Sequence, residues 1–178
     1  MKNTLKLMML VLLAFGMMAC GEKKLTQEDM KEAELTLFGD DGAIKPEVVP
    51  EVAEKYCKFV EQNPDDPTAP TWLFHAMELN IAMKNADKSI ELCDKLLEQY
   101  PESKWAPNAL LVMGSYLYED QLNDTARAHQ AYQRLIDDYP DNGLVQNAQV
   151  LIECLGMTDE EKLSWIQMSK LEEVEEEW

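Results

Sequence analysis

The chain has 178 residues, enough for about one domain or a short array of repeats. Its hydrophobic content of 46 % supports a core and excludes a fully disordered protein. Lysine and arginine number 16 against 34 aspartates and glutamates, for a formal net charge of −18. A protein that binds nucleic acid needs a basic face to displace counterions, so this charge argues against nucleic acid as a partner.

Residues 1–19 have the pattern of a signal peptide. Lys2 and Lys6 are basic, and the apolar run that follows, residues 7–18, is too short to cross a bilayer. The run ends at Ala19, Cys20 and Gly21. A small residue before cysteine resembles the lipobox of bacterial lipoproteins, which implies that Cys20 is acylated and becomes the mature N-terminus. The alternative is an ordinary cleavable signal peptide.

A lipidated Cys20 would hold the protein stably on a membrane. The residue after the cysteine is glycine and not the aspartate that resembles an inner-membrane retention signal, which favours anchoring in the outer membrane. The glycine does not decide the leaflet, and we expect the periplasmic face. Residues 20–25 would then form a lipid-anchored spacer. Because the rest of the chain is strongly acidic, we expect it to stand off the headgroups.

Residues 26–157 are predicted to form repeated helices. Thr26 followed by Asp29 is typical of a helix start, and the glycines and aspartates of residues 38–42 indicate a turn. Similar apolar segments end at Pro64, Pro101 and Pro140, which lie 37 and 39 residues apart. Because proline cannot donate the next backbone hydrogen bond, each proline is expected to follow a helix end. A second helix with one apolar face lies between successive prolines.

Antiparallel helix pairs with this period, ending in Tyr-Pro, resemble tetratricopeptide repeats. The resemblance implies an all-α fold, a short helical repeat solenoid of antiparallel helix pairs. In the best unit a small insertion is expected to lengthen the turn around residues 120–123. The residues of this unit that match the family pattern, and so form its predicted core, are Ala109, Leu110, Met113, Gly114, Leu117, Ala128, Tyr132, Leu135 and Pro140.

Residues 158–171 are predicted to form a C-terminal capping helix. Thr158 and Glu161 have the spacing of a capping box, and Leu163 lies on the apolar side that would cover the repeats. Residues 172–178 form an acidic tail, which we expect to be solvated. The tail ends in Trp178, a residue type common at interfaces.

Groups that carry chemistry are sparse. His75 and His129 lie far apart and belong to no metal-binding motif, and no serine, histidine and acid occur together in a catalytic pattern. We therefore expect no catalytic residues, no metal, no cofactor and no enzyme activity. Cys57, Cys93 and Cys154 are interpreted as small buried residues.

The sequence favours a scaffold that binds other envelope proteins or peptides. The first helices of a solenoid line its concave surface, which receives partners. The resemblance extends to two lipoprotein or periplasmic families of Gram-negative cells: the outer-membrane protein assembly lipoprotein, which implies a role in envelope biogenesis, and the Tol–Pal coordinator, which implies control of cell-wall synthesis and constriction. The partner-binding candidates on these helices are Asn80, Lys84, Asn108, Tyr116 and Asn147.

The alternative from a different class is a glycan-binding or small-molecule-binding accessory lipoprotein. Trp72, Trp105 and Trp165 would then serve as platforms on which sugars stack.

Overall fold

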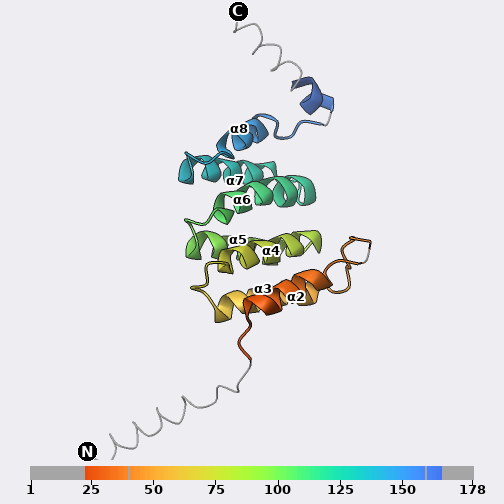
Figure 1. Ribbon diagram of the computed structural model, residues 1–178. Helices are drawn as coiled ribbons and strands as arrows, with labels where there is room; N and C mark the ends of the chain where they lie inside the picture. Colours follow the sequence, from red (N-terminus) through yellow and green to blue (C-terminus); the bar gives the residue numbers. More distant parts are fainter. Residues whose placement is uncertain (1–22, 40, 159, 166–178) are drawn as a thin grey trace, which may run out of the picture.

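The computed structural model describes residues 23–39, 41–158 and 160–165. The predictions for the signal peptide, for Cys20 and for the acidic tail concern residues outside these ranges. Within them the chain is a stack of antiparallel helices (Figure 1). The helices are α2 (Gln27–Thr36), α3 (Val49–Gln62), α4 (Ala69–Ala82), α5 (Ala86–Gln99), α6 (Trp105–Val112), the π-helix η2 (Met113–Gln121), α7 (Thr125–Asp138) and α8 (Val145–Glu153).

Each helix packs against the next one along the chain. In addition, α4 contacts α6, which is the first helix of the following pair. Residues 160–165 add a short helical segment after α8. The predicted all-α repeat architecture is thus confirmed. None of the helices in the described ranges is long and apolar enough to cross a membrane.

The three prolines end the helices that the sequence assigned to them. In each case the proline comes directly after the C-cap residue of the helix: Pro64 after α3, Pro101 after α5 and Pro140 after α7. The turns after them repeat as well, because each contains a short polar side chain that accepts a hydrogen bond from the backbone N–H two residues later. These side chains belong to Asp66, Ser103 and Asn142, with distances of 2.8, 3.2 and 2.9 Å. The period of 37 and 39 residues therefore describes loops as well as helices.

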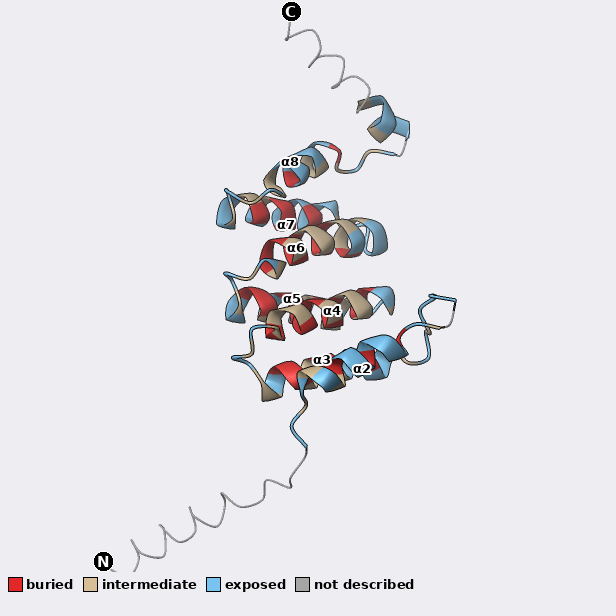
Figure 2. Cartoon of the chain, viewed as in Figure 1, coloured by how far each residue is buried: buried red, intermediate tan, exposed pale blue. Residues whose placement is uncertain are grey.

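The core runs continuously through the stack between the helices (Figure 2). Its largest fully buried side chains include Tyr56, Phe59, Leu96, Tyr132 and Leu135. Eight of the nine predicted core residues of the best unit are buried. The exception is Pro140, which is exposed because it lies in the turn beyond α7.

The best unit of the sequence is the second complete repeat of the structure, formed by α6, η2 and α7. Its insertion lies in the first helix of the pair and not in the turn. The segment from Ala106 to the helix cap Asp124 is two residues longer than the equivalent segment from Ala69 to Asn85. The chain accommodates the extra residues by widening α6 into the π-helix η2, in which Leu122 N–H donates to Leu117 O, five residues earlier, at 2.9 Å. The prediction of a longer turn at residues 120–123 was wrong, because a π-helix can take up inserted residues without changing its ends.

Gly114 and Tyr132 form a size-matched pair between η2 and α7. A Cβ atom on Gly114 would lie 2.8 Å from Cδ1 and Cζ of the Tyr132 ring, and closer still to Cε1. In the preceding repeat the same two positions hold Met77 and Cys93, both buried. The large and small partners thus exchange helices between repeats, which keeps the packed volume similar.

The stack ends at α8 for a reason that can be read from its sequence. The position held by buried Leu73 in α4 and by buried Leu110 in α6 is occupied by exposed Gln149 in α8. The capping box at Thr158 is present, with Glu161 N–H donating to Thr158 Oγ1 at 3.3 Å. However, Leu163 is 61 % exposed, so the expected apolar contact of this residue with the repeats was wrong.

Candidate binding surface

The first helices of the successive pairs expose a shared set of positions, which we call the first-helix surface. The repeat spacing aligns Thr71 with Asn108 and Asn147, and it aligns His75 with Val112 and Leu151. Its described residues are Thr71, His75 and Glu78 on α4, Asn108, Val112 and Tyr116 on α6 and η2, and Asn147, Val150 and Leu151 on α8.

This surface is apolar toward its C-terminal half. Tyr116 is 60 % exposed and Val150 is 39 % exposed, although both are large hydrophobic side chains. Val112, four residues before Tyr116, and Leu151, next to Val150, are partly exposed. Exposed aromatic side chains with aliphatic neighbours are typical of protein interfaces.

Three of the five predicted partner-binding residues lie on the first-helix surface. Tyr116 and Asn147 are exposed, and Asn108 is partly exposed. The side-chain amide of Asn108 donates to Lys104 O at 2.7 Å, which leaves its carbonyl oxygen directed away from the helix backbone. Whether these residues contact a partner stays a prediction.

Asn80 and Lys84 do not lie where the sequence placed them. Asn80 is only 5 % exposed; its amide donates to Ala76 O at 2.8 Å, and its side-chain oxygen accepts from Asn85 at 3.2 Å. It therefore holds the turn between α4 and α5. Lys84 lies beyond the end of α4 in that turn, with a positive φ of 59° that Asn123 repeats one unit later at 48°. Periodicity misplaced both residues because it does not locate the last turn of a helix.

An aromatic cluster occupies the other half of the surface. The rings of Phe74 and Trp105 stack with centroids 4.6 Å apart, and the ring of His75 lies 5.6 Å from that of Trp105. Trp105 Nε1 donates to Thr71 Oγ1 at 2.9 Å, and His75 Nδ1 lies 3.1 Å from Glu78 Oε2. These contacts join α4 to α6.

The cluster does not support the alternative of sugar stacking on Trp72 and Trp105. Trp72 is 7 % exposed and packs on Tyr56, with ring centroids 5.0 Å apart. Trp105 is engaged by the stacked Phe74 and by the Lys104 ammonium, 4.7 Å from the ring centroid. Trp165 is partly exposed in the helical segment after α8, and its role as a platform stays a prediction.

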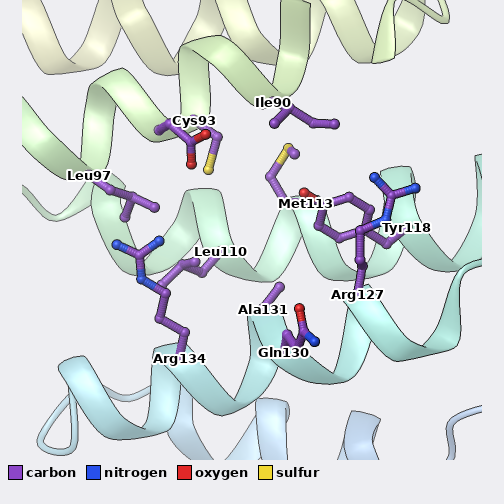
Figure 3. A pocket seen from close by; sticks show the side chains of 11 residues that line it. Ile90, Cys93, Leu97, Leu110, Met113, Tyr118, Arg127, Gln130, Ala131 and Arg134 are labelled. Carbon is purple, nitrogen blue, oxygen red and sulfur yellow. The ribbon is translucent and has the colours of Figure 1, made fainter. Parts of the chain in front are cut away.

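A hollow of about 190 Å³ lies on the opposite side, between α5 and α7 (Figure 3). The two arginines of the sequence, Arg127 and Arg134, both line it, and Cys93 and Met113 lie between them. Each arginine is already paired through Nε: Arg127 with Asp124 at 2.7 Å, and Arg134 with Asp138 at 3.1 Å. Asp94 also lines the hollow, so its negative charge and those of the paired aspartates offset the positive charge of the two arginines. The hollow therefore has no strong preference for anions.

The thiols are held in their neutral form. Burial and the neighbouring Asp94 raise the pKa of Cys93 to about 12, and burial raises the pKa of Cys57 and of Cys154. Cys93 and Cys154 are buried, as predicted, whereas Cys57 is partly exposed. Thiols that stay protonated are poor nucleophiles and metal ligands. Among the described residues no three histidine, cysteine or acidic side chains are grouped as metal ligands would be.

Glu119 is a polar residue that sequence reasoning missed. Its carboxylate accepts from Lys162 at 2.8 Å and from the Tyr132 hydroxyl at 3.4 Å, and its side chain is only 15 % exposed. Burial, with the charge of Glu119, raises the pKa of Tyr132 well above its usual range. The contact fastens the segment after α8 to η2, and no local pattern links residues 43 positions apart.

The fold defines a class of protein: an all-α repeat of antiparallel helix pairs, with an exposed, partly apolar face along its first helices. Two stretches of the chain, residues 73–103 and 108–142, match the family model of the tetratricopeptide repeat. These stretches correspond to α4 with α5 and to α6, η2 and α7, so two successive helix pairs of the chain are similar to the tetratricopeptide repeat. Tetratricopeptide repeats mediate protein–protein interactions. No curated protein matched the chain in a comparison of sequences.

Proposed function

We propose that the protein is a lipid-anchored scaffold that holds partner proteins at the periplasmic face of the outer membrane, in envelope biogenesis or outer-membrane protein assembly. The observation that carries the binding role is the first-helix surface, where Tyr116 and Val150 stay exposed on a rigid repeat framework. The lipobox at Cys20 supports the anchor. Confinement by the lipid raises the effective concentration of a bound partner near the membrane.

The surface favours a partner segment with apolar side chains. Tyr116, Val112 and Val150 supply apolar area, and the Asn108 and Asn147 side chains supply hydrogen bonds for a peptide backbone. Glu78 is the acidic member of the surface, so a basic residue beside the apolar ones would add to binding.

A photo-crosslinking experiment tests the binding role. A p-benzoylphenylalanine is placed at position 116, and a matched control carries the same group at His129, which is exposed on α7. A defined crosslinked product at position 116 and none at position 129 is the expected result. Equal products at both positions, or none, would contradict binding at the first-helix surface.

The identity of the crosslinked product separates the two envelope roles. The barrel-assembly insertase would support outer-membrane protein assembly, whereas cell-wall synthases or Tol–Pal components would support a coordinator of cell-wall synthesis and constriction. The anchor is tested separately by Cys20→Ala, which should move the protein from the membrane fraction to the soluble fraction. Continued sedimentation of this variant with membranes would refute lipidation.

A further inference from the structure

The first layer of the stack, formed by α2 and α3, carries an apolar patch that we define as Leu35, Phe38 and Ile44. These side chains are 77 %, 45 % and 51 % exposed. Leu35 projects from the side of α2 opposite to buried Met30 and Ala33, away from the repeats. The patch belongs to the first layer of the stack, and Figure 1 shows the loop that joins α2 to α3 at the end of α2 remote from the preceding chain.

The loop between α2 and α3 is built to hold two of these side chains together. Phe38 and Ile44 form an antiparallel bridge, which makes their side chains neighbours. Two backbone hydrogen bonds flank the bridge: Gly39 N–H donates to Ala43 O at 2.8 Å, and Lys45 N–H donates to Leu37 O at 2.7 Å. The exposed apolar pair is therefore a fixed feature of the loop.

The chain before α2 is fastened to the repeats, which fixes where the anchor leaves the folded body. Leu25 N–H donates to Gln62 Oε1 at 2.7 Å, and Asn63 Nδ2 donates to Leu25 O at 3.2 Å. Gln27 Nε2 donates to Asp66 Oδ1 at 2.7 Å and also to the Thr68 hydroxyl. These bonds hold residues 25–27 against the end of α3 and the turn that follows it.

Few residues then separate the proposed lipid from the folded body. Cys20 lies five residues before Leu25, the first fastened residue, a span of at most about 18 Å even when fully extended. A tether of this length would keep the N-terminal layer of the stack near the membrane, although the charge of the chain favours a position away from the headgroups. The α2 layer is the part of the stack closest to the anchor.

The charge distribution agrees with this orientation. Residues 23–45 contain four lysines and six acidic residues, a net charge of −2, whereas residues 46–178 contain ten basic and 27 acidic residues, a net charge of −17. Repulsion by the membrane surface is thus weakest at the α2 layer. Lys23, Lys24 and Lys31 are exposed there, next to the tether and along α2.

We propose that the α2 layer lies on the bilayer, with Leu35, Phe38 and Ile44 in the headgroup–acyl boundary, so that the lipid anchor and the patch together fix the orientation of the array. The proposal rests on the lipid anchor of the proposed function. The occupant of the patch is a zwitterionic phospholipid surface, because Glu28, Glu32 and Glu34 on α2 oppose anionic lipids. Contact of the patch with the bilayer, in addition to the lipid anchor, would fix the orientation of the array relative to the membrane. The first-helix surface would then keep one direction in which to meet partners.

Depth-dependent fluorescence quenching tests this proposal on the lipidated full-length protein. The Phe38→Trp variant is reconstituted into vesicles of phosphatidylcholine and phosphatidylethanolamine, with or without bromine on the acyl chains. Gln149→Trp, at an exposed position of α8 at the far end of the stack, is the matched control, and the unsubstituted protein gives the background of the native tryptophans. Thermal melts check that both variants are folded, and Leu35→Trp repeats the measurement on α2.

We expect about twofold quenching of the added tryptophan at positions 38 and 35 and none at position 149, since an interfacial helix lies about 5–10 Å into the boundary. Vesicle flotation without quenching at positions 38 and 35 would overturn the orientation while leaving the anchor intact. Absence of flotation would instead refute the anchor and, with it, this proposal. A dimer crosslinked through position 38 would show a second copy on the patch and would also overturn the proposal.

Discussion

Gly114→Ala tests whether close packing between η2 and α7 limits the sequence of the second complete repeat. In an ordinary helix interior, alanine is favoured over glycine by about 1 kcal/mol. Here the new methyl would lie 2.8 Å from Cδ1 and Cζ of Tyr132, and closer to Cε1. The Tyr132 ring is fully buried, so it has no solvent-filled space into which to move.

Forcing an additional methyl into a packed core typically costs about 1–3 kcal/mol. After the helix-propensity gain is subtracted, we expect the free energy of unfolding to fall by up to about 2 kcal/mol, which is up to about 4–8 °C in Tm for a chain of this length. Gly143→Ala is the matched control, because a Cβ there meets no atom within 4 Å. Its Tm should change by less than about 2 °C.

A double-mutant cycle makes the cause specific. In a Tyr132→Leu background the ring is absent, so Gly114→Ala should become neutral or stabilising, and the two substitutions should be coupled by about 1 kcal/mol or more. The assay is thermal and urea unfolding followed by circular dichroism. If Gly114→Ala raised Tm in the wild-type background, that result would refute the packing argument. The Tyr132 ring would then have moved aside without a loss of stability.

Lys84→Gly should raise the free energy of unfolding by about 1 kcal/mol in urea titrations, because φ at this position is 59° and glycine adopts it without strain; Met83→Gly, at φ −76°, should lower it. Lys162→Ala should lower Tm by about 4 °C, since it leaves the partly buried Glu119 carboxylate without its 2.8 Å ion pair, while Lys88→Ala, whose pair with Glu91 is exposed, should lower Tm by less than half as much. Hydrogen bonds from Thr26 hold the pKa of Asp29 at about 2, below its unfolded value of 3.8, so their contribution is complete above about pH 4 and is lost as the pH falls toward 2. The protection factors of the α2 amides against exchange should therefore fall in that pH range before those of α7 do, and a simultaneous fall of both would contradict a local role.

Features set by one residue and its neighbours could be read from the sequence. The prolines locate three helix ends because the missing N–H acts wherever the residue lies. The resemblance to the tetratricopeptide pattern implied that Tyr132 and Leu135 belong to the core, and both are buried. The general position of the first-helix surface, through Asn108, Tyr116 and Asn147, followed from the helical period.

Features that depend on two distant segments could not be read in this way. Asn80 appeared to be a surface residue because periodicity cannot show that Asn85, across the turn, takes its side-chain oxygen. The two extra residues before Asp124 are visible as a longer spacing, but their uptake as a π-helix depends on which carbonyl each N–H selects. The contact of Lys162 with Glu119 joins residues 43 positions apart. In each case the deciding partner is remote in sequence.

The two ends of the stack therefore differ in what they leave uncovered. At the C-terminal end, Gln149 replaces the leucines of the earlier repeats, while Val150 and Leu163 stay exposed among the described residues. At the N-terminal end, Leu35, Phe38 and Ile44 stay exposed, and two of them are held together by the bridge in the α2–α3 loop. Repeat arrays require a polar outer face at their ends for solubility. Three large apolar side chains in the layer nearest a proposed acyl anchor are explained by contact with lipid, and one fluorescence measurement can decide this orientation of the array.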